Sequence, residues 1–253
     1  MKILLTNDDG IHAPGIAALF TEMSKLGEVF VVAPDRERSA SAHAITLMTP
    51  LRVKHIEQNE HFAGYAINGM PADCVKVAYW ALGIRPDIII SGINLGSNSG
   101  INLLYSGTVS AAAEGIFVNV PSFAISLATF TNPDFGPAAR FARKLTSLIL
   151  QNGLPRGTIL NVNVPAVPEN ELTGVQVTQM GQAYYQENYD KRDDPHNHTY
   201  YWLTGNKVDV EMDDTVDDRA LMNNKISITP IQFDLTNYSF MDQLNKWKFQ
   251  NDK

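Results

Sequence analysis

The first ten residues, MKILLTNDDG, constrain the fold of this chain more than any other stretch. Residues 2–6 form a short, mainly apolar run, which predicts a buried strand. The run ends directly in four polar or small residues: Asn7, Asp8, Asp9 and Gly10. A helical pattern follows, with Pro14 placed for its first turn. Because ligands of α/β proteins bind at the carboxyl ends of parallel strands, this stretch predicts a ligand site at the tip of the first strand.

Two adjacent carboxylates, Asp8 and Asp9, define the chemistry expected at that tip. Charged oxygens are costly to bury without a partner, and a hard divalent cation held by oxygen ligands is a common partner for them. A solvated turn that caps the following helix is the alternative interpretation of the same residues. Whether this stretch is a metal site or a simple turn therefore depends on the side chains at the other strand ends.

Strands and helices alternate from the first residue to about Pro165, which predicts a Rossmann-like, mostly parallel sheet with helices on both faces. The apolar patterns predict strands at residues 2–6, 28–33, 45–48, 51–56, 64–68, 87–91, 122–127 and 158–164. Helical periodicity predicts helices at residues 13–26, 71–82, 108–117 and 136–151. We expect this α/β core to comprise residues 1–180, with a further strand at 175–179.

The segment 181–224 has a different character, because it is polar, acidic and aromatic and contains the Tyr-Tyr-Trp run at 200–202. It is too short to enclose a core of its own, and exposed aromatic side chains favour cover by another subunit. We therefore expect an extended, β-rich arm or hairpin for oligomerisation, whereas a lobe packed on its own monomer is the alternative. Residues 225–253 would return to the core as a strand at 225–231 and a helix at 241–249.

Composition excludes some classes of partner. The net charge of −7 and the lack of a Lys or Arg run argue against a nucleic-acid polymer. No apolar run approaches the ~18 residues that a membrane span needs. Cys74 is the only cysteine, which suits a reducing compartment, and Met1 leads straight into a strand without the pattern of a secretion signal. We therefore expect a cytoplasmic protein that contacts neither membrane nor nucleic-acid polymer.

Oxygen donors gather at three predicted strand ends. The first strand ends at Asp8 and Asp9, the second leads to Ser39, and the strand at 87–91 leads to Asn94. Carboxylate, hydroxyl and amide oxygens suit Mg²⁺, Mn²⁺ or Ca²⁺ rather than zinc. Taken singly, Ser39 and Asn94 are also ordinary turn residues. Together, the four side chains predict one divalent cation per subunit, with Mg²⁺ or Mn²⁺ favoured.

The run Tyr-Ser-Gly-Thr-Val at 105–109 precedes a helix rich in alanine. Free backbone N–H groups at a helix start, beside the hydroxyls of Ser106 and Thr108 and next to Gly107, can bind phosphate; simple capping of the helix is the alternative. A metal beside an anion site indicates phosphate-ester chemistry. The chain lacks the motifs of P-loop triphosphatases, dinucleotide-binding Rossmann domains and serine hydrolases.

These motifs, in this order and spacing, resemble the SurE family of survival-protein nucleotidases. The resemblance is almost continuous from Met1 to about Gly115 and resumes in three later segments. It is carried by NDDG (7–10), APGI (13–16), APDRERSA (33–40), PADCV (71–75), DIIISGINLG (87–96), YSGTVSAAAEG (105–115), LNVNVP (160–165), YYW (200–202) and SITP (227–230).

The resemblance implies a metal-dependent phosphomonoesterase that releases phosphate from nucleoside 5′-monophosphates, and also from 3′-monophosphates. It implies metal ligands at Asp8, Asp9, Ser39 and Asn94, and an arm exchanged between the subunits of a homodimer or homotetramer. The alternatives that remain are a short-chain exopolyphosphatase and a non-catalytic module that senses a cation or phosphate.

Roles in catalysis can be assigned as hypotheses. We expect Asp8, Asp9 and Asn94 to act in catalysis, with Asp8 orienting or deprotonating the attacking water. His43 could protonate the leaving oxygen if it reaches the cleft, or it could be a loop histidine that is satisfied locally. Glu114 is expected to brace the structure rather than to act in catalysis. Residues expected to contact the substrate, or to brace the loop that does so, are Asn7, His43, Asn98, Ser106, Gly107 and Thr108.

Overall fold

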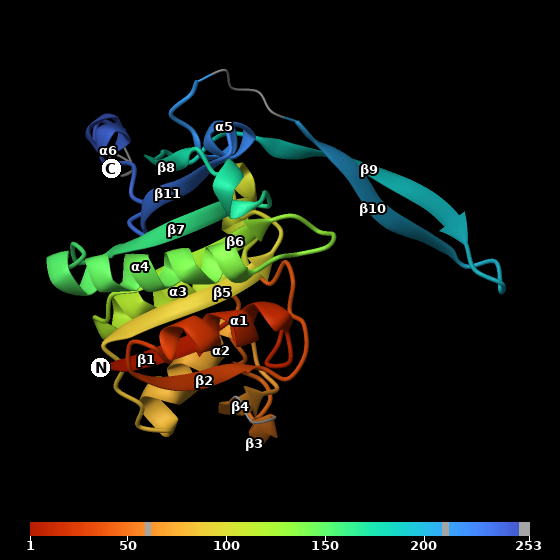
Figure 1. Cartoon of the computed structure of the whole chain (residues 1–253). Coiled ribbons are helices and arrows are strands. Elements are labelled where there is room, and N and C mark those ends of the chain that lie inside the picture. The colour runs from red at the N-terminus through yellow and green to blue at the C-terminus, as the bar shows by residue number, and fades with distance from the viewer. Residues whose placement is uncertain (59–61, 209–212, 248–253) are drawn as a thin grey trace, which may run out of the picture.

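The computed structural model describes residues 1–58, 62–208 and 213–247 of the chain. A nine-stranded sheet forms its centre, in the order β3-β4-β2-β1-β5-β6-β7-β11-β8 (Figure 1). All pairs from β4 to β7 are parallel, whereas β3 and β11 run antiparallel to β4 and β7. The strands are β1 (Lys2–Thr6), β2 (Glu28–Pro34), β3 (Val53–Gln58), β4 (Phe62–Ile67), β5 (Ile88–Leu95), β6 (Ser122–Ala128), β7 (Thr158–Pro165), β8 (Gly174–Val177) and β11 (Lys225–Gln232).

Helices cover both faces of this sheet, which confirms the Rossmann-like α/β fold. The first strand shows why, since Ile3 and Leu5 pack toward α1 and α4 while Leu4 packs toward α2 and α3. All three side chains are fully buried, as expected of a strand covered on both faces. The helices are α1 (Pro14–Met23), α2 (Pro71–Lys76), α3 (Gly107–Val118), α4 (Gly136–Asn152), α5 (Asp217–Met222) and α6 (Tyr238–Leu244), with short 3-10 helices at Gly100–Tyr105 and Glu169–Glu171.

The order of the strands creates a crevice. From β1 the chain moves outward through β2 to β4, and β5 then returns to the other side of β1. The connections that leave β1 and β5 therefore diverge at their carboxyl ends. Such a switch point is where doubly wound sheets bind ligands, and the residues after β1 lie at this point.

Apart from shifts of up to three residues at the ends of elements, four element predictions differ from the structure. Residues 45–48 form no strand, because the Thr46 N–H donates to the Asp73 carboxylate (3.1 Å) instead of to a ladder. The helix predicted to end at Leu82 is α2 followed by a π-helical turn, Val77–Ala81. The strand predicted to end at Ser91 continues to Leu95. The last helix begins at Tyr238, because Asn237 caps it by accepting from the Phe240 N–H, and it ends at Leu244 instead of at 249.

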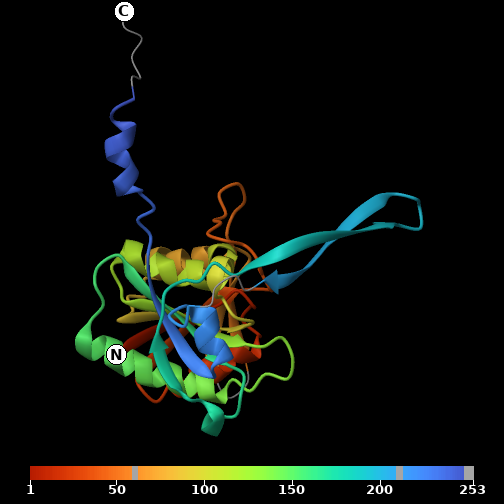
Figure 2. The same cartoon turned by 90° about the horizontal axis from the view of Figure 1, so that it is seen from above.

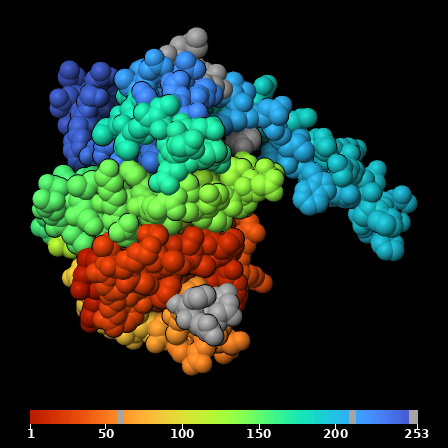
Figure 3. Space-filling view, in the orientation of Figure 1, coloured from red at the N-terminus to blue at the C-terminus, as the bar shows by residue number. Residues whose placement is uncertain are grey.

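A long antiparallel hairpin, β9 (Tyr184–Asp193) and β10 (Thr199–Val208), stands out from the body of the molecule (Figures 1 and 2). The space-filling view shows the same projection (Figure 3). After the hairpin, α5 leads back to the body, and β11 inserts between β7 and β8. An extended segment within 181–224 is thus present as predicted. None of the described helices is both long and apolar enough to cross a membrane.

Candidate active site

A cavity of about 320 Å³ lies at the switch point of the sheet. It brings together residues that are far apart in sequence, from the ends of β1 and β5, from the loop after β2 and from the start of α3. The predicted site residues that line it are Asp8, Ser39, Asn94, Asn98 and Ser106. The predicted convergence of these strand ends is therefore correct for Asp8, Ser39 and Asn94, whereas Asp9 is not among the residues that line the cavity.

The loop after β1 is held by Asn7, which is fully buried. Its side-chain amide donates to the Gly10 carbonyl (2.9 Å), and its Oδ1 accepts from the Gly10 N–H (3.1 Å). The loop is also tied to the segment after β2, because the Asp8 carbonyl accepts from the Arg38 N–H (2.7 Å). Asn7 thus braces the turn that presents the two carboxylates, and a contact of Asn7 with substrate stays a prediction.

The start of α3 contacts Asp8 directly. The Thr108 hydroxyl donates to Asp8 Oδ1, and Ser106 caps the helix by accepting from the Val109 N–H (3.1 Å). Gly107 permits this approach, because a Cβ there would lie 2.7 Å from Ser41 Oγ and 3.0 Å from Asp8 Oδ2. The capping interpretation of Ser106 is confirmed. The positive end of α3 faces the Asp8 carboxylate in this structure.

The two carboxylates lie in an environment short of positive charge. Burial raises the pKa of Asp8, although its hydrogen bond from Thr108 opposes the shift. Burial, and next the charge of Asp8, raise the pKa of Asp9 to about 7. Among the described residues, neither carboxylate forms an ion pair with a lysine or arginine. A bound cation would stabilise the charged form of both carboxylates.

A second observation fits a cation or an anion beside Asp8. Ser41 Oγ is buried beside Gly107, which also adjoins the Asp8 carboxylate, and it has no hydrogen-bond partner among the described residues. No three His, Cys, Asp or Glu side chains of the described part gather as a metal site. The candidate set instead combines two carboxylates with neutral oxygens, a composition that suits hard cations such as Mg²⁺ or Mn²⁺.

Asn94 reaches the cavity through a bulge in β5. The pairing of β5 with β6 shifts register between Ser91 and Asn94, at Gly92, where a Cβ would lie 2.2 Å from the Ile125 carbonyl oxygen. Bulges of this kind redirect side chains near sites. The side-chain N–H of Asn94 donates to the Gly96 carbonyl (2.7 Å). The Asn94 Oδ1 has no hydrogen bond of this kind within the described part of the chain, so it can bind a ligand.

Ser39 and Asn98 differ in how firmly they are held. Ser39 is exposed on the loop after β2 and donates to Glu37 Oε1 (2.5 Å). Asn98 is buried, and its side-chain amide donates to Ser126 Oγ (2.8 Å) while its backbone N–H donates to Asn163 Oδ1 (2.8 Å). Asn98 therefore belongs to a rigid floor, and Ser39 to a rim.

His43 does not line this cavity. Its Nε2 lies 2.8 Å from Glu114 Oε1 on α3, and Lys76 also pairs with Glu114 (2.9 Å). The ring stands edge-on to Phe233. This is the arrangement expected of a histidine satisfied locally, and it gives Glu114 the bracing contacts expected from the sequence. A role of His43 as the acid would need it to leave Glu114.

Comparison with known proteins shows the family of this chain. The family model described as "Survival protein SurE" matches residues 3–187. A "5'-nucleotidase SurE" from Syntrophobacter fumaroxidans is 47% identical over 98% of this chain and 99% of its own length. The chain belongs to the SurE family. A second "5'-nucleotidase SurE", from Heliobacterium modesticaldum, is 49% identical over 98% of this chain and 92% of its own length. The crystal structure of the SurE protein from Aquifex aeolicus superposes with a TM-score of 0.84 at 37% identity, covering 97% of this chain and 98% of that one.

Further residues of this SurE-family chain line the cavity but were not predicted from the sequence. They are Ala40, Leu95, Ser97, Asn102, Tyr105, Phe130 and Lys207. Tyr105 directly precedes the predicted phosphate loop, so its position was a usable signal. Phe130, which is 71% exposed, and Lys207 come from a loop after β6 and from the end of β10. Their approach to the switch point depends on tertiary packing that no local pattern indicates.

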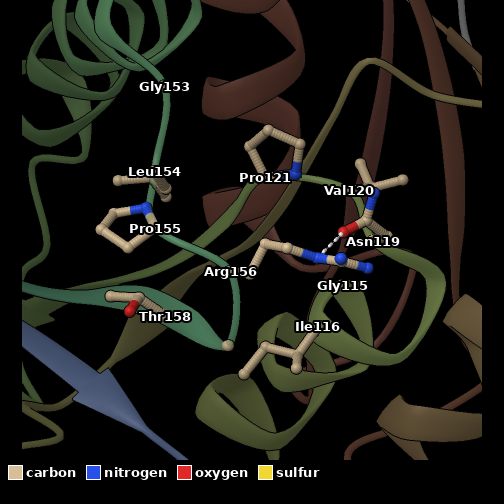
Figure 4. Close-up of a pocket in the computed structure, with 11 residues that line it drawn as sticks. Gly115, Ile116, Asn119, Val120, Pro121, Gly153, Leu154, Pro155, Arg156 and Thr158 are labelled. Atoms are coloured by element: carbon tan, nitrogen blue, oxygen red, sulfur yellow. Dashed lines mark hydrogen bonds between the residues drawn. The ribbon is translucent and has the colours of Figure 1, made fainter.

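A hollow at the opposite edge of the SurE-family sheet provides a contrast. It has a volume of about 450 Å³ and lies between the end of α3 and the loop that precedes β7 (Figure 4). The Arg156 guanidinium there donates to Asn119 Oδ1 (3.2 Å). No carboxylate lines this hollow, so it lacks the oxygen set found at the switch point.

Proposed function

We propose that this chain, as a member of the 5′-nucleotidase SurE family, is a metal-dependent phosphomonoesterase that acts on nucleoside 5′-monophosphates and also on 3′-monophosphates. The family and the relatives named 5′-nucleotidase SurE support the reaction class. The paired carboxylates at the switch point, whose pKa values are raised by burial, support the need for a cation.

A second cavity supports a nucleoside as the leaving group. It has a volume of about 780 Å³ and shares Ala40, Asn102 and Tyr105 with the first cavity, so the two adjoin. Its other walls are Ile101, Tyr184, Glu187, Leu203, Thr204 and Gly205. This mostly apolar lining includes one carboxylate and no lysine or arginine, which suits an aromatic base better than a chain of further phosphates.

This observation carries the choice between the two enzyme hypotheses. A short-chain exopolyphosphatase needs positive charge along its bound chain, whereas the second cavity presents Glu187 to whatever extends beyond the scissile phosphate. Polyphosphate is therefore the weaker candidate. The third hypothesis, a sensor module, differs from an enzyme only in the absence of turnover.

The residues present fit a divalent cation, and Asp8, Asp9, Ser39 and Asn94 would hold it. When bound, such a cation neutralises the paired carboxylates and lowers the negative charge against which a phosphate must approach. Thr108 keeps Asp8 oriented by its hydrogen bond, and Asp8 would orient the attacking water or accept its proton. Asn94 would act beside these carboxylates. Asn98, Ser106 and Gly107 would contact the substrate.

Assembly through the hairpin is a further part of the proposal. Tyr189 on β9 and Tyr201 and Trp202 on β10 are each more than half exposed, and large exposed aromatic side chains on a projecting element favour cover by a second copy. We propose a homodimer or homotetramer in which the hairpins contact neighbouring subunits. Nucleoside monophosphates remain the small-molecule partners.

Phosphate release from a panel of nucleoside 5′- and 3′-monophosphates and short polyphosphates tests the function. Turnover is expected with Mg²⁺ or Mn²⁺, is expected to stop with chelator, and should favour the nucleotides. Asp8→Asn should lower turnover by more than about a hundredfold, because ligand loss exceeds the effect of losing a supporting residue. Asp242→Asn, which alters an exposed carboxylate on α6, is the matched control. Absence of release from a folded sample under every metal would favour the sensor module instead.

A further inference from the structure

One positively charged side chain lines the candidate active-site cavity, and it belongs to the hairpin. Lys207 is the penultimate residue of β10, and it is the only lysine or arginine among the lining residues that the structure describes. The remaining lining is neutral except for Asp8. In a chain of net charge −7, a lysine at this position is conspicuous beside a site for a phosphate dianion.

The Lys207 ammonium is held in place from behind. It donates to Ser99 Oγ (2.9 Å) and to Asp218 Oδ1. The Asp218 side chain is only 7% exposed and lies in the first turn of α5, whereas the Lys207 side chain is 29% exposed. Ser99 also donates to Asp218 (2.6 Å). The carboxylate thus fixes the ammonium, which keeps access to the cavity.

The donors of the ammonium leave room for an anion. A lysine has three N–H donors, and within the described part of the chain Ser99 and Asp218 accept two of them. The neighbouring carboxylate, Asp217, accepts from the Gly100 N–H (3.0 Å) and the Gly181 N–H (3.0 Å). The 3-10 segment that lines the cavity, the hairpin base and α5 are therefore joined at one point.

We propose that Lys207 is a substrate-binding residue that contacts the phosphate with its third N–H, and that Asp218 is its positioning residue. The inference rests on the proposed function, because the anion is the phosphate of the substrate or product. Because Lys207 belongs to β10, a movement of the hairpin would then also change the affinity of the active site for phosphate. The competing explanation is that Lys207 only braces the loop through Ser99 and Asp218.

Binding of inorganic phosphate separates contact from bracing, and it needs no turnover. Titration calorimetry would be carried out on the whole protein with Mn²⁺ and with chelator. Lys207→Met should weaken phosphate binding by about tenfold or more, the range expected for the loss of one hydrogen bond to a charged group, whereas Lys207→Arg should largely keep it. Asp218→Asn keeps an amide oxygen that can still accept from the ammonium but removes its counter-charge, so phosphate binding should become tighter. Lys144→Met, which removes an exposed charge from α4, should change nothing.

The direction of the Asp218→Asn effect decides the matter. If bracing is the role of the pair, Asp218→Asn and Lys207→Met weaken phosphate binding alike, and the proposal is overturned. Unchanged phosphate binding in Lys207→Met also overturns it. Thermal unfolding of each variant confirms that the protein is folded. With nucleotide as substrate, Lys207→Met should raise KM more than it lowers kcat. If Lys207→Met binds phosphate more weakly but neither the wild type nor any variant turns over nucleotide, the assignment of Lys207 stands and the proposed function is rejected.

Discussion

The parallel core and the projecting hairpin differ in how far they bury their apolar side chains. In the core, Ile3, Leu4 and Leu5 are completely buried between helices on both faces. In the hairpin, Tyr201 and Trp202 are 60% and 58% exposed. Both regions have well-paired strands, so hydrogen bonding does not distinguish them. The difference is that the core supplies its own cover.

This difference explains where chemistry can be placed. The carboxylates of the candidate site lie at the tips of covered strands, where the backbone is fixed by packing on both faces. The hairpin contributes to the same cavity only near its base, through Lys207. We therefore expect substitutions at the strand tips to abolish activity, and substitutions in the outer hairpin to alter assembly first.

The strongest test of the core side is Gly107→Ala. The new Cβ would lie 2.7 Å from Ser41 Oγ and 2.9 Å from Asp8 Cβ, so the start of α3 or the tip of β1 must move. A misplacement of this kind is expected to lower kcat/KM by about a hundredfold and to lower the free energy of unfolding by about 1–3 kcal/mol. Phosphate release and urea unfolding measure the two effects.

Gly153→Ala provides the control, because it separates lost stability from lost activity. Gly153 follows α4 at φ +75°, and a Cβ added there would meet no described atom within 4 Å. Because φ +75° with ψ 170° is a backbone conformation almost restricted to glycine, the substitution should cost about 1–3 kcal/mol through backbone strain and should leave kcat/KM unchanged. Equal activity losses in the two glycine variants would mean that stability alone explains the effect at Gly107.

The same contrast shows what the sequence could predict. Local patterns located the strands of the core, because strand periodicity is encoded in short windows. The convergence of Asp8, Ser39 and Asn94 followed from the rule that ligands of doubly wound sheets bind at the carboxyl ends of the strands. The extension of β5 to Leu95 was missed, since Gly92 reads as the end of a strand although it forms a bulge.

Individual side-chain contacts between distant segments could not be predicted. The Thr108 hydroxyl was expected to bind phosphate, whereas the structure places it on Asp8. Lys207 reaches the cavity only because β10 returns beside the 3-10 segment after β5. Neither contact leaves a trace in periodicity or spacing, because each depends on how whole elements pack against one another.

The hairpin side of the comparison is tested by removing its aromatic surface. Tyr200 and Trp202 lie on one face of β10, with their rings 6.5 Å apart between centroids. The double substitution Tyr200→Ser and Trp202→Ser should reduce the assembled fraction in sedimentation analysis while circular dichroism and thermal unfolding of the core stay nearly unchanged. Activity should fall only several-fold, since neither residue lines a described cavity.

An exposed pair away from the hairpin serves as its control. Leu235 is 87% exposed and Met222 is 59% exposed, and their replacement by serine removes apolar surface of another part of the chain. Assembly should survive that change. Loss of assembly in both double variants, or in neither, would contradict a specific role for the aromatic face of β10.

The smallest expected effect is on the pH dependence of stability. It is tested by comparing one carboxylate from the core with one from the hairpin. Burial alone would raise the pKa of Glu114, but hydrogen bonds from His43 and Lys76 outweigh it and lower the pKa below 4.5. The unfolded chain then binds the proton more readily than the folded one, so the contribution is present above about pH 4.5 and is lost as pH falls through the folded pKa. Urea midpoints of the wild type should therefore fall more steeply on acidification than those of Glu114→Gln.

Asp194, near the hairpin tip, is the counterpart in the comparison. Hydrogen bonds from the backbone N–H groups of His198 and His196 lower its pKa as well, yet the carboxylate is tied only to its own turn. Asp194→Asn should leave the acid dependence of the global unfolding midpoint as in the wild type, because the tip can open without the core. A flattened acid dependence in Asp194→Asn, equal to that in Glu114→Gln, would show that hairpin and core unfold as one unit, and the division drawn between the two regions would then fail.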